Sequence, residues 1–302
     1  MQNKIKKDRT LAASILVSVV ILSGAWIYTT GQKTTDQNQS NIQTASEKES
    51  SLALEEQVLP SEGVTLPVSW GDLGVKLMSV GAIDADRFKA IYEQRGDFTS
   101  EYDNLLSGHN DDKLKITKEN SGYLLNLFWA LGLASKNEIL ENGEMVNPAY
   151  GGAGNFASTG GWTLAKGDAM DHYSKHKFFN LTSEQQAMVD KVSRGIYRPC
   201  CGNSTHFPDC NHGMAMLGFL QLMASQDVSE QEMWETALQV NSYWFPETYM
   251  TLATYFKQQG TDWDKVDPRL ALGGEYSSAS GYQRVLQEIE PIELQGGGGC
   301  SV

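Results

Sequence analysis

Residues 123–131 read YLLNLFWAL, and this run decides the class of the fold. On a helix its side chains would be apolar almost all the way round, which is typical of a helix buried in a protein interior. Thr117 can cap this helix, which we expect to span residues 116–133. The run is too short and too interrupted to be a membrane span. The sequence therefore predicts a buried helix here.

Helical signals recur along the rest of the chain. Residues 212–224 read HGMAMLGFLQLMA and predict a second apolar helix. Asp84 can cap a helix on which Phe88, Ile91 and Tyr92 share one face. Other helices are expected over residues 69–80, 182–194, 229–243, 246–259 and 279–290, two of them opened by the capping boxes Thr182/Gln185 and Ser229/Glu232. No convincing alternating strand longer than four residues is found, so the predicted class is mainly α.

The N-terminal part carries a long uncharged segment. Residues 11–30 read LAASILVSVVILSGAWIYTT, and such a run can cross a hydrocarbon core of roughly 30 Å as a helix. The basic segment 1–10 would keep the N-terminus in the cytoplasm. A cleaved signal peptide is the alternative, because Ser23-Gly24-Ala25 has the small-x-small pattern of a cleavage site. Both interpretations place residues 31–302 outside the cytoplasm, and a single-pass membrane protein is predicted.

Composition divides the remaining chain. Residues 31–60 are rich in Gln, Thr, Ser, Asn and Glu, and they predict a disordered polar linker. Residues 61–290 are long enough for one helical domain with a sizeable core, and residues 291–302 form a Gly-rich tail. The formal net charge is −13 and the sequence pI about 4.8. An acidic surface repels phosphate backbones, so nucleic acid is not an expected partner.

Glycines cluster between residues 151 and 161, where five of eleven residues are Gly. A phosphate-binding loop would need a strand before it and a helix after it, with a Lys-Ser/Thr pair for a P-loop. This context is missing. We therefore expect an irregular loop whose glycines let the backbone pass close to the cysteine-rich loop or to a partner.

Cysteine and histidine are concentrated in one part of the chain. Of the five His and four Cys, seven lie between residues 172 and 212. They are His172, His176, Cys200, Cys201, His206, Cys210 and His212. The last cysteine, Cys300, follows four glycines near the end of the chain. The concentration indicates a site, although short loops joined by disulfides could produce it as well.

Adjacent cysteines restrict the possible disulfides. Neighbouring Cα atoms lie about 3.8 Å apart, whereas disulfides need roughly 4.4–6.8 Å between Cα atoms. We therefore expect Cys200 and Cys201 to have different partners. One of them could pair with Cys210 and the other with Cys300, or the thiols could share a metal ion.

A metal centre would draw on soft ligands. We expect Cys200, Cys201, Cys210, His212, Cys300 and His206 as its ligands, with His172 and His176 as weaker candidates. Thiolate and imidazole, with the thioethers of Met214 and Met216 nearby, favour copper(I) and then zinc. Those methionines also suit ordinary core packing. Cys210 precedes a helix, whose dipole predicts a lowered pKa and a more nucleophilic sulfur.

The histidine pair would bind differently. If residues 168–176 are helical, His172 and His176 lie on one face and could hold one ion, with Asp168 beside them. A solvated polar helix is the alternative. His109 is expected in a surface loop.

Three functions remain open from the sequence. The first is membrane-anchored handling of copper or zinc, with a metal-transport protein as partner. The second is thiol–disulfide exchange through Cys200, Cys201 and Cys300, with a thiol-redox partner. Because Cys300 follows four glycines, the tail resembles the mobile C-terminal cysteine arms of mercuric reductases and large thioredoxin reductases, although their flavin-binding GxGxxG signature is missing. The third is a helical binding or scaffold module with structural disulfides.

Overall fold

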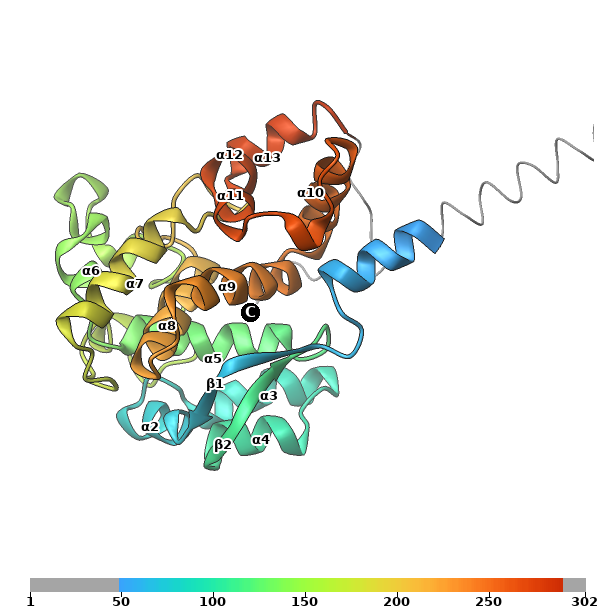
Figure 1. Cartoon of the computed structure of the whole chain (residues 1–302). Helices are drawn as coiled ribbons and strands as arrows, with labels where there is room; N and C mark the ends of the chain where they lie inside the picture. The colour runs from blue at the N-terminus through green and yellow to red at the C-terminus, as the bar shows by residue number, and fades with distance from the viewer. Residues whose placement is uncertain (1–48, 290–302) are drawn as a thin grey trace, which may run out of the picture. The chain divides into compact units, whose positions relative to one another are not determined.

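The computed structural model describes residues 49–289. The chain divides between Ala53 and Leu54 into two units, and the second unit contains the elements below. Helices predominate in it, as predicted (Figure 1).

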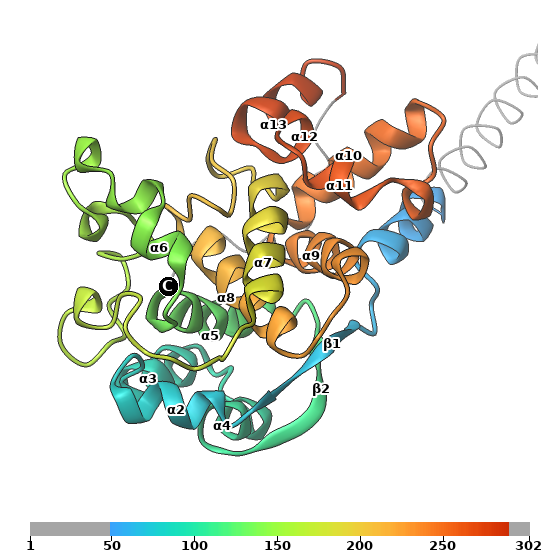
Figure 2. The same ribbon diagram turned by 60° about the vertical axis from the view of Figure 1, so that its left-hand side comes forward.

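Two apolar helices form the centre of this unit, α5 (Ser121–Ala134) and α8 (Asn211–Ser225). They lie side by side in both views (Figures 1 and 2), and every residue of α8 from His212 to Ala224 is buried. Their backbones meet at two glycines. A Cβ atom on Gly132 would lie 2.0 Å from the Met214 carbonyl oxygen, and one on Gly218 would lie 2.5 Å from the Phe128 carbonyl oxygen. The close crossing therefore depends on the absence of these two side chains.

A two-stranded antiparallel sheet lies beside this pair, formed by β1 (Val64–Gly71) and β2 (Asn110–Ile116). Leu66, Val68 and Trp70 alternate into the core, and the Trp70 indole donates a hydrogen bond of 2.7 Å to the Leu105 carbonyl oxygen. The prediction that no such strand exists was wrong. Pro67 interrupts the pattern of β1, and proline within a strand is tolerated at edges and bulges, both of which this short sheet has.

The sheet shortens two predicted helices. Trp70 belongs to β1, so the helix predicted over 69–80 is α2 (Leu73–Val80). Ile116 ends β2, so the helix predicted from 116 begins only at Ser121. Between the end of β2 and the start of α5, the Asn120 side chain accepts a hydrogen bond from the Thr117 amide, and the Thr117 hydroxyl accepts one from the Asn120 amide.

Most other predicted helices are confirmed. Asp84 caps α3 (Ala85–Arg95), and α4 (Ser100–Ser107) follows it. Thr182 and Gln185 form both bonds of a capping box at α7 (Ser183–Gly195). At α9 (Glu230–Trp244) Ser229 accepts a hydrogen bond from the Glu232 amide, but the return bond of the predicted capping box is not formed. The predicted α10 (Pro246–Gln258) is present, and α13 (Ala279–Val285) is shorter than the predicted 279–290. The short helices α4, α6 (Glu138–Asn142), α11 (Pro268–Leu272) and α12 (Gly274–Ser277) were not predicted.

The predicted membrane topology needs correction. Within residues 49–289 no helix combines the length and the apolar composition that crossing a bilayer requires. The apolar helices α5 and α8 have 14 and 15 residues, which makes them about 21 and 23 Å long, shorter than a hydrocarbon core of roughly 30 Å. Residues 11–30, where the transmembrane helix was predicted, lie outside the described residues. The single-pass topology and the extracytoplasmic placement relied on that helix, and neither is supported.

Candidate thiol site

The cysteines lie in the connection between α7 and α8. This loop folds back on itself, because the Thr205 amide donates to the Ile196 carbonyl oxygen at 2.8 Å and Tyr197 forms an antiparallel bridge with Ser204. Cys200 and Cys201 lie within the resulting turn, and Cys210 occupies the position before the first residue of α8. The fold of the loop therefore returns Cys210 to the two cysteines that precede it by about ten residues.

The three sulfur atoms converge on one point. The Sγ atoms of Cys200, Cys201 and Cys210 all lie within 4.8 Å of one another, and those of Cys200 and Cys210 are 3.5 Å apart. All three are free thiols; Cys200 is exposed and the other two are half-buried. Four thiolates around zinc, with bonds of about 2.3 Å at tetrahedral angles, would lie about 3.8 Å apart. The distance between the Cys200 and Cys210 sulfur atoms is close to that value.

A buried arginine faces the sulfur atoms. The Arg198 side chain is only 1% exposed, and its Nε donates to the Cys210 sulfur at 3.0 Å. Its other nitrogens donate to the carbonyl oxygens of Asn203 (3.0 Å) and Phe207 (3.1 Å) and to the Asp209 carboxylate (2.6 Å). The guanidinium is thus held in place by the loop that carries the thiols.

Helix α8 makes room for this guanidinium at Gly213. A Cβ atom there would lie 2.5 Å from Arg198 Cζ and 2.8 Å from its Nε. Because four hydrogen-bonded partners hold the guanidinium, it could not move aside without losing some of them. A glycine in the first turn of α8 is therefore part of how the site is built.

The three cysteines shift one another's pKa values in opposite directions. Hydrogen bonds from Cys200 and then Cys201 lower the pKa of Cys210 well below its ordinary value, against the effect of burial, and Arg198 and His212 act in the same direction. Hydrogen bonding with Cys201 and Cys210 raises the pKa of Cys200. For Cys201, hydrogen bonding with Cys200 favours the thiolate, but hydrogen bonding with Cys210 and burial outweigh it and raise its pKa to about 11. The lowered pKa of Cys210 agrees in direction with the prediction, but the neighbouring cysteines, Arg198 and His212 cause it rather than the helix dipole.

Neither Cys200 nor Cys201 forms a disulfide, and both sulfur atoms lie in one group with that of Cys210, so the expectation that they have different partners stays a prediction. Cys200 is the neighbour of Cys210, whereas the Cys201 sulfur lies 3.9 Å from the Asn203 carbonyl oxygen. Cys300 lies outside the described residues.

His212 lies beside Cys210 without joining the group of three. Within residues 49–289, the set of potential metal ligands within 4.8 Å of one another contains the three cysteines and no histidine. The His212 ring packs against Phe245, with ring centroids 4.4 Å apart, and is 3% exposed. Its side chain hydrogen-bonds to Cys210, so it supports the thiolate. Met214 and Met216 are buried in α8 as part of the core.

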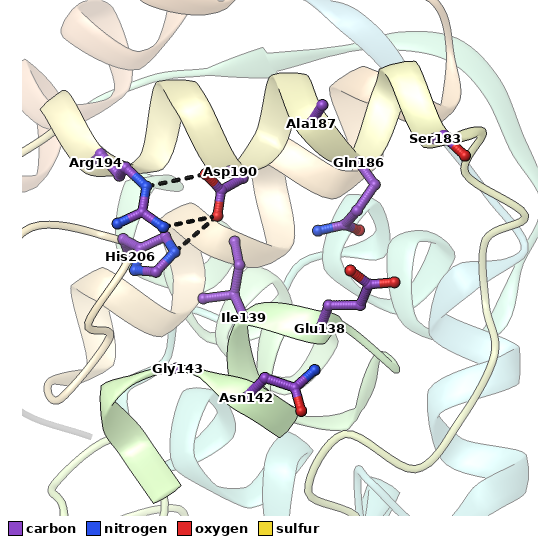
Figure 3. Close-up of a pocket in the computed structure, with 10 residues that line it drawn as sticks. All are labelled: Glu138, Ile139, Asn142, Gly143, Ser183, Gln186, Ala187, Asp190, Arg194 and His206. Carbon is purple, nitrogen blue, oxygen red and sulfur yellow. Dashed lines mark hydrogen bonds and ion pairs between the residues drawn. The ribbon is translucent and has the colours of Figure 1, made fainter. Parts of the chain in front are cut away.

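His206 is directed toward carboxylates. Its Nε2 lies 2.9 Å from the Asp190 carboxylate, and its Nδ1 lies 3.1 Å from the Glu144 carboxylate. Asp190 also accepts two hydrogen bonds from Arg194, of 2.9 and 3.0 Å (Figure 3). Arg194, and more weakly His206, lower the pKa of Asp190 against the effect of burial. Asp190, Arg194 and His206 line a cavity of about 500 Å³.

His172 and His176 meet without the predicted helix. Residues 169–171 form one 3₁₀ turn, and Ser174 adopts a positive φ of 49°, which ends any helical repeat. The two rings approach to 3.2 Å between His172 Nδ1 and His176 Nε2. Burial, then His172 and Lys175, lower the pKa of His176. Asp168 caps the 3₁₀ turn through the Met170 amide. The imidazoles therefore bond to each other.

The glycine-rich segment passes close to the thiol loop, as expected. The Ser158 amide donates to the Asp209 carbonyl oxygen at 3.1 Å, and the Phe156 and Phe207 rings are 5.3 Å apart. The sequence reasoning missed Arg198 and Asp209. Their proximity in sequence to Cys200 and Cys210 was the available signal.

Comparison of the chain with protein-family models, with curated proteins and with solved structures finds no match.

Proposed function

We propose that the loop between α7 and α8 binds one soft metal ion, copper(I) or zinc, through the thiolates of Cys200, Cys201 and Cys210. The observation that carries this proposal is the convergence of three sulfur atoms within 4.8 Å of one another. Two thiols would be enough for a disulfide, whereas a third sulfur at the same point adds a ligand. Thiolate ligands select copper(I) and zinc among the common metal ions.

Charge supports this proposal. Three thiolates carry a charge of −3, which a half-buried group of sulfur atoms can hold only if cations compensate most of it. Arg198 supplies one positive charge at 3.0 Å from Cys210, so zinc would neutralise the remaining two and copper(I) would leave one at the exposed Cys200. Metal binding should also release protons, because each cysteine that is still protonated loses its proton when it binds the ion.

Coordination number separates the two metals. Copper(I) is satisfied by soft sulfur ligands, and the three thiolates would be sufficient for it. Zinc takes four ligands, so a water molecule or another side chain would complete its shell. The Cys300 thiol is the sequence-based candidate for that fourth position.

The test uses the full chain, reduced and free of oxygen. Copper(I) and zinc are titrated separately, and bound metal is measured by elemental analysis together with the protons released. We expect one ion per chain and at least a hundredfold loss of affinity in Cys210→Ser, whereas the exposed His109→Gln control should bind normally. A chain that takes up neither metal, or a Cys210→Ser variant with unchanged affinity, would refute the proposal. If Cys300→Ser loses affinity for zinc but not for copper(I), the Cys300 thiol is the fourth zinc ligand.

A second function is favoured by one contact, the 3.5 Å between the Cys200 and Cys210 sulfur atoms. The Cys210 thiolate can attack a small disulfide such as oxidised glutathione, releasing one glutathione thiolate. The Cys200 thiol then loses its proton and displaces the second glutathione, which leaves a Cys200–Cys210 disulfide and two reduced glutathiones. In this case mass spectrometry should show the loss of two hydrogens, in Cys201→Ser as in the parent chain. Peptide mapping should locate the bond between Cys200 and Cys210 in the parent chain, and an oxidised parent chain without that disulfide would exclude the reaction.

A further inference from the structure

The three thiols differ in their access to solvent. Cys200 is exposed, whereas Cys201 and Cys210 are half-buried. Arg198 lies on the buried side of the group, since its side chain is 1% exposed and donates to the Cys210 sulfur at 3.0 Å. A dissolved molecule that approaches the group therefore meets Cys200 first.

Cys200 and Cys210 are placed to form a bond with each other. Their sulfur atoms are 3.5 Å apart, and a disulfide would bring them to roughly 2.0 Å. The movement needed is about 1.5 Å, which an exposed side chain such as that of Cys200 can make without disturbing the core.

Cys201 is less free to pair with either of them. Its carbonyl oxygen accepts a hydrogen bond of 2.9 Å from the Ala279 amide at the start of α13, and its amide donates to the Arg198 carbonyl oxygen at 3.4 Å. Its Cα atom lies about 3.8 Å from that of its sequence neighbour Cys200, which is too close for an ordinary disulfide. Oxidation should therefore join Cys200 to Cys210 and leave Cys201 as a thiol.

A Cys200–Cys210 disulfide would remove most of what holds a metal ion. Its two sulfur atoms are no longer thiolates, and the thiolate is the form of cysteine that binds metals. Two of the three proposed ligands, and two of their three negative charges, would be lost together. Arg198 would still be paired with the Asp209 carboxylate at 2.6 Å, so the buried guanidinium would keep an anionic partner.

We infer that the metal site is controlled by oxidation: a small disulfide such as oxidised glutathione joins Cys200 to Cys210, and the site then releases its ion. The inference rests on the proposed metal site and assigns a regulation to it. Metal binding and the Cys200–Cys210 disulfide exclude each other, so the oxidised chain should bind metal again only after reduction.

The reaction exchanges one disulfide for another. A cysteine that binds a metal ion is deprotonated, so in the loaded site the exposed Cys200 is a thiolate and can attack one sulfur of oxidised glutathione. This step bonds Cys200 to one glutathione and releases the other as a thiolate. The Cys210 thiolate then attacks the Cys200 sulfur, forms the Cys200–Cys210 bond and displaces the second glutathione thiolate. Two electrons pass from the two cysteines to glutathione, and only Cys201 remains as a ligand.

The test uses the full chain, reduced and loaded separately with zinc and with copper(I) in the absence of oxygen. After oxidised glutathione is added, free metal is separated by gel filtration and measured by elemental analysis, and peptide mapping by mass spectrometry quantifies the Cys200–Cys210 disulfide. We expect one ion to be released for each such disulfide. Reduction by a phosphine should restore one bound ion per chain.

Three controls separate this route from others. Reduced glutathione at twice the concentration should leave most of the ion in place, which excludes direct capture of the metal by glutathione. His109→Gln, at an exposed position outside the site, should release metal as the parent chain does. Cys201→Ser keeps the reacting pair and should form the same disulfide, with or without bound metal; if it does not, the pair is wrongly assigned.

The outcomes distinguish this inference from the proposed function. A loaded chain that forms no Cys200–Cys210 disulfide, or that keeps its ion after forming it, overturns the inference and leaves the proposed metal site standing. A chain that takes up neither metal fails at the loading step, and the proposed function then falls together with the inference.

Discussion

At position 198 the loop places a guanidinium in the protein interior, where a thiolate, a carboxylate and two carbonyl oxygens surround it. A buried charge of this kind is stable only with its partners, and removing one side of a buried pair costs about 3–5 kcal/mol. Arg198 and the Cys210 thiolate therefore depend on each other. Burial alone would lower the pKa of Arg198, but Cys210, Cys201 and Asp209 outweigh it and raise that pKa.

Replacing Arg198 with Met should raise the pKa of Cys210. The variant removes the positive charge and the Nε donor, so a smaller fraction of Cys210 is thiolate at pH 7; each pKa unit is a factor of ten. The measurement is the pH dependence of alkylation by iodoacetamide, followed residue by residue by mass spectrometry. Arg194→Met, which removes an exposed arginine of α7, serves as the control. If Arg198→Met fails to fold, Gly213→Ala should shift the same titration by displacing the guanidinium. An unshifted Cys210 titration in both variants would contradict this account.

The ionisation of Cys210 should also appear in the pH dependence of stability. In the unfolded chain Cys210 titrates near pH 9, and its folded pKa lies well below that. Between these two values the unfolded state binds more protons, so the free energy of unfolding rises with pH by up to about 1.4 kcal/mol per pH unit. Below the folded pKa this contribution is lost. Above pH 9 the raised pKa of Cys201, about 11, acts in the opposite direction.

We therefore expect the free-energy difference between the parent chain and Cys210→Ser, both reduced and metal-free, to grow from pH 7 to pH 9. Denaturant titrations at several pH values provide it. Parallel curves for the two proteins across this range would show that Cys210 is not preferentially ionised in the fold.

The residues of the thiol site were only partly predictable. The three cysteines could be grouped because they are close in sequence and chemically distinctive. The partners of His206 could not be predicted, because Glu144 lies 62 residues and Asp190 16 residues away in the sequence. Only the packing of α7 against the segment after α6 brings these residues together.

Among the elements, α5 and α8 depend most on small side chains. Gly218→Ala would place a Cβ 2.5 Å from the Gly132 nitrogen and the Phe128 carbonyl oxygen, both backbone atoms that cannot turn aside. We expect a loss of about 1–3 kcal/mol in the free energy of unfolding, measured by denaturant titration. Gly122→Ala, in the first turn of α5, is the matched control, because a Cβ there meets nothing within 4 Å. That control should be neutral or stabilising by up to about 1 kcal/mol. Equal effects of the two substitutions would mean that the crossing is looser than described.

Elements that depend on neighbouring residues were predicted better than elements that depend on residues far away in the sequence. The Thr182/Gln185 capping box and the apolar runs of α5 and α8 depend on residues within one or two turns, so the sequence displays them directly. The strands depend on each other: β1 pairs Val64 with Ile116, fifty-two positions along the chain, and nothing local marks that pairing. The histidine pair failed as a helix for a similar reason, because the segment follows Ser135 through a bridge at His176.

For the whole molecule, a bound ion should appear as added stability. An ion that binds the folded chain alone stabilises it by about 2.7 kcal/mol at one hundred times its dissociation constant. Differential scanning calorimetry with saturating zinc or copper(I) should therefore raise the unfolding temperature of the parent chain. A chelator should reverse the rise, and Cys210→Ser should show none. A rise of the same size in Cys210→Ser would place the metal elsewhere.

The contact between the Arg198 guanidinium and Gly213 also has an evolutionary consequence. A mutation that adds any side chain at 213 would damage the thiolate without altering a cysteine, and a mutation of Arg198 would leave the glycine free to vary. In descendants of this sequence, positions 198 and 213 should therefore change together. Lineages that lose the pair should soon cease to be selected for the three cysteines.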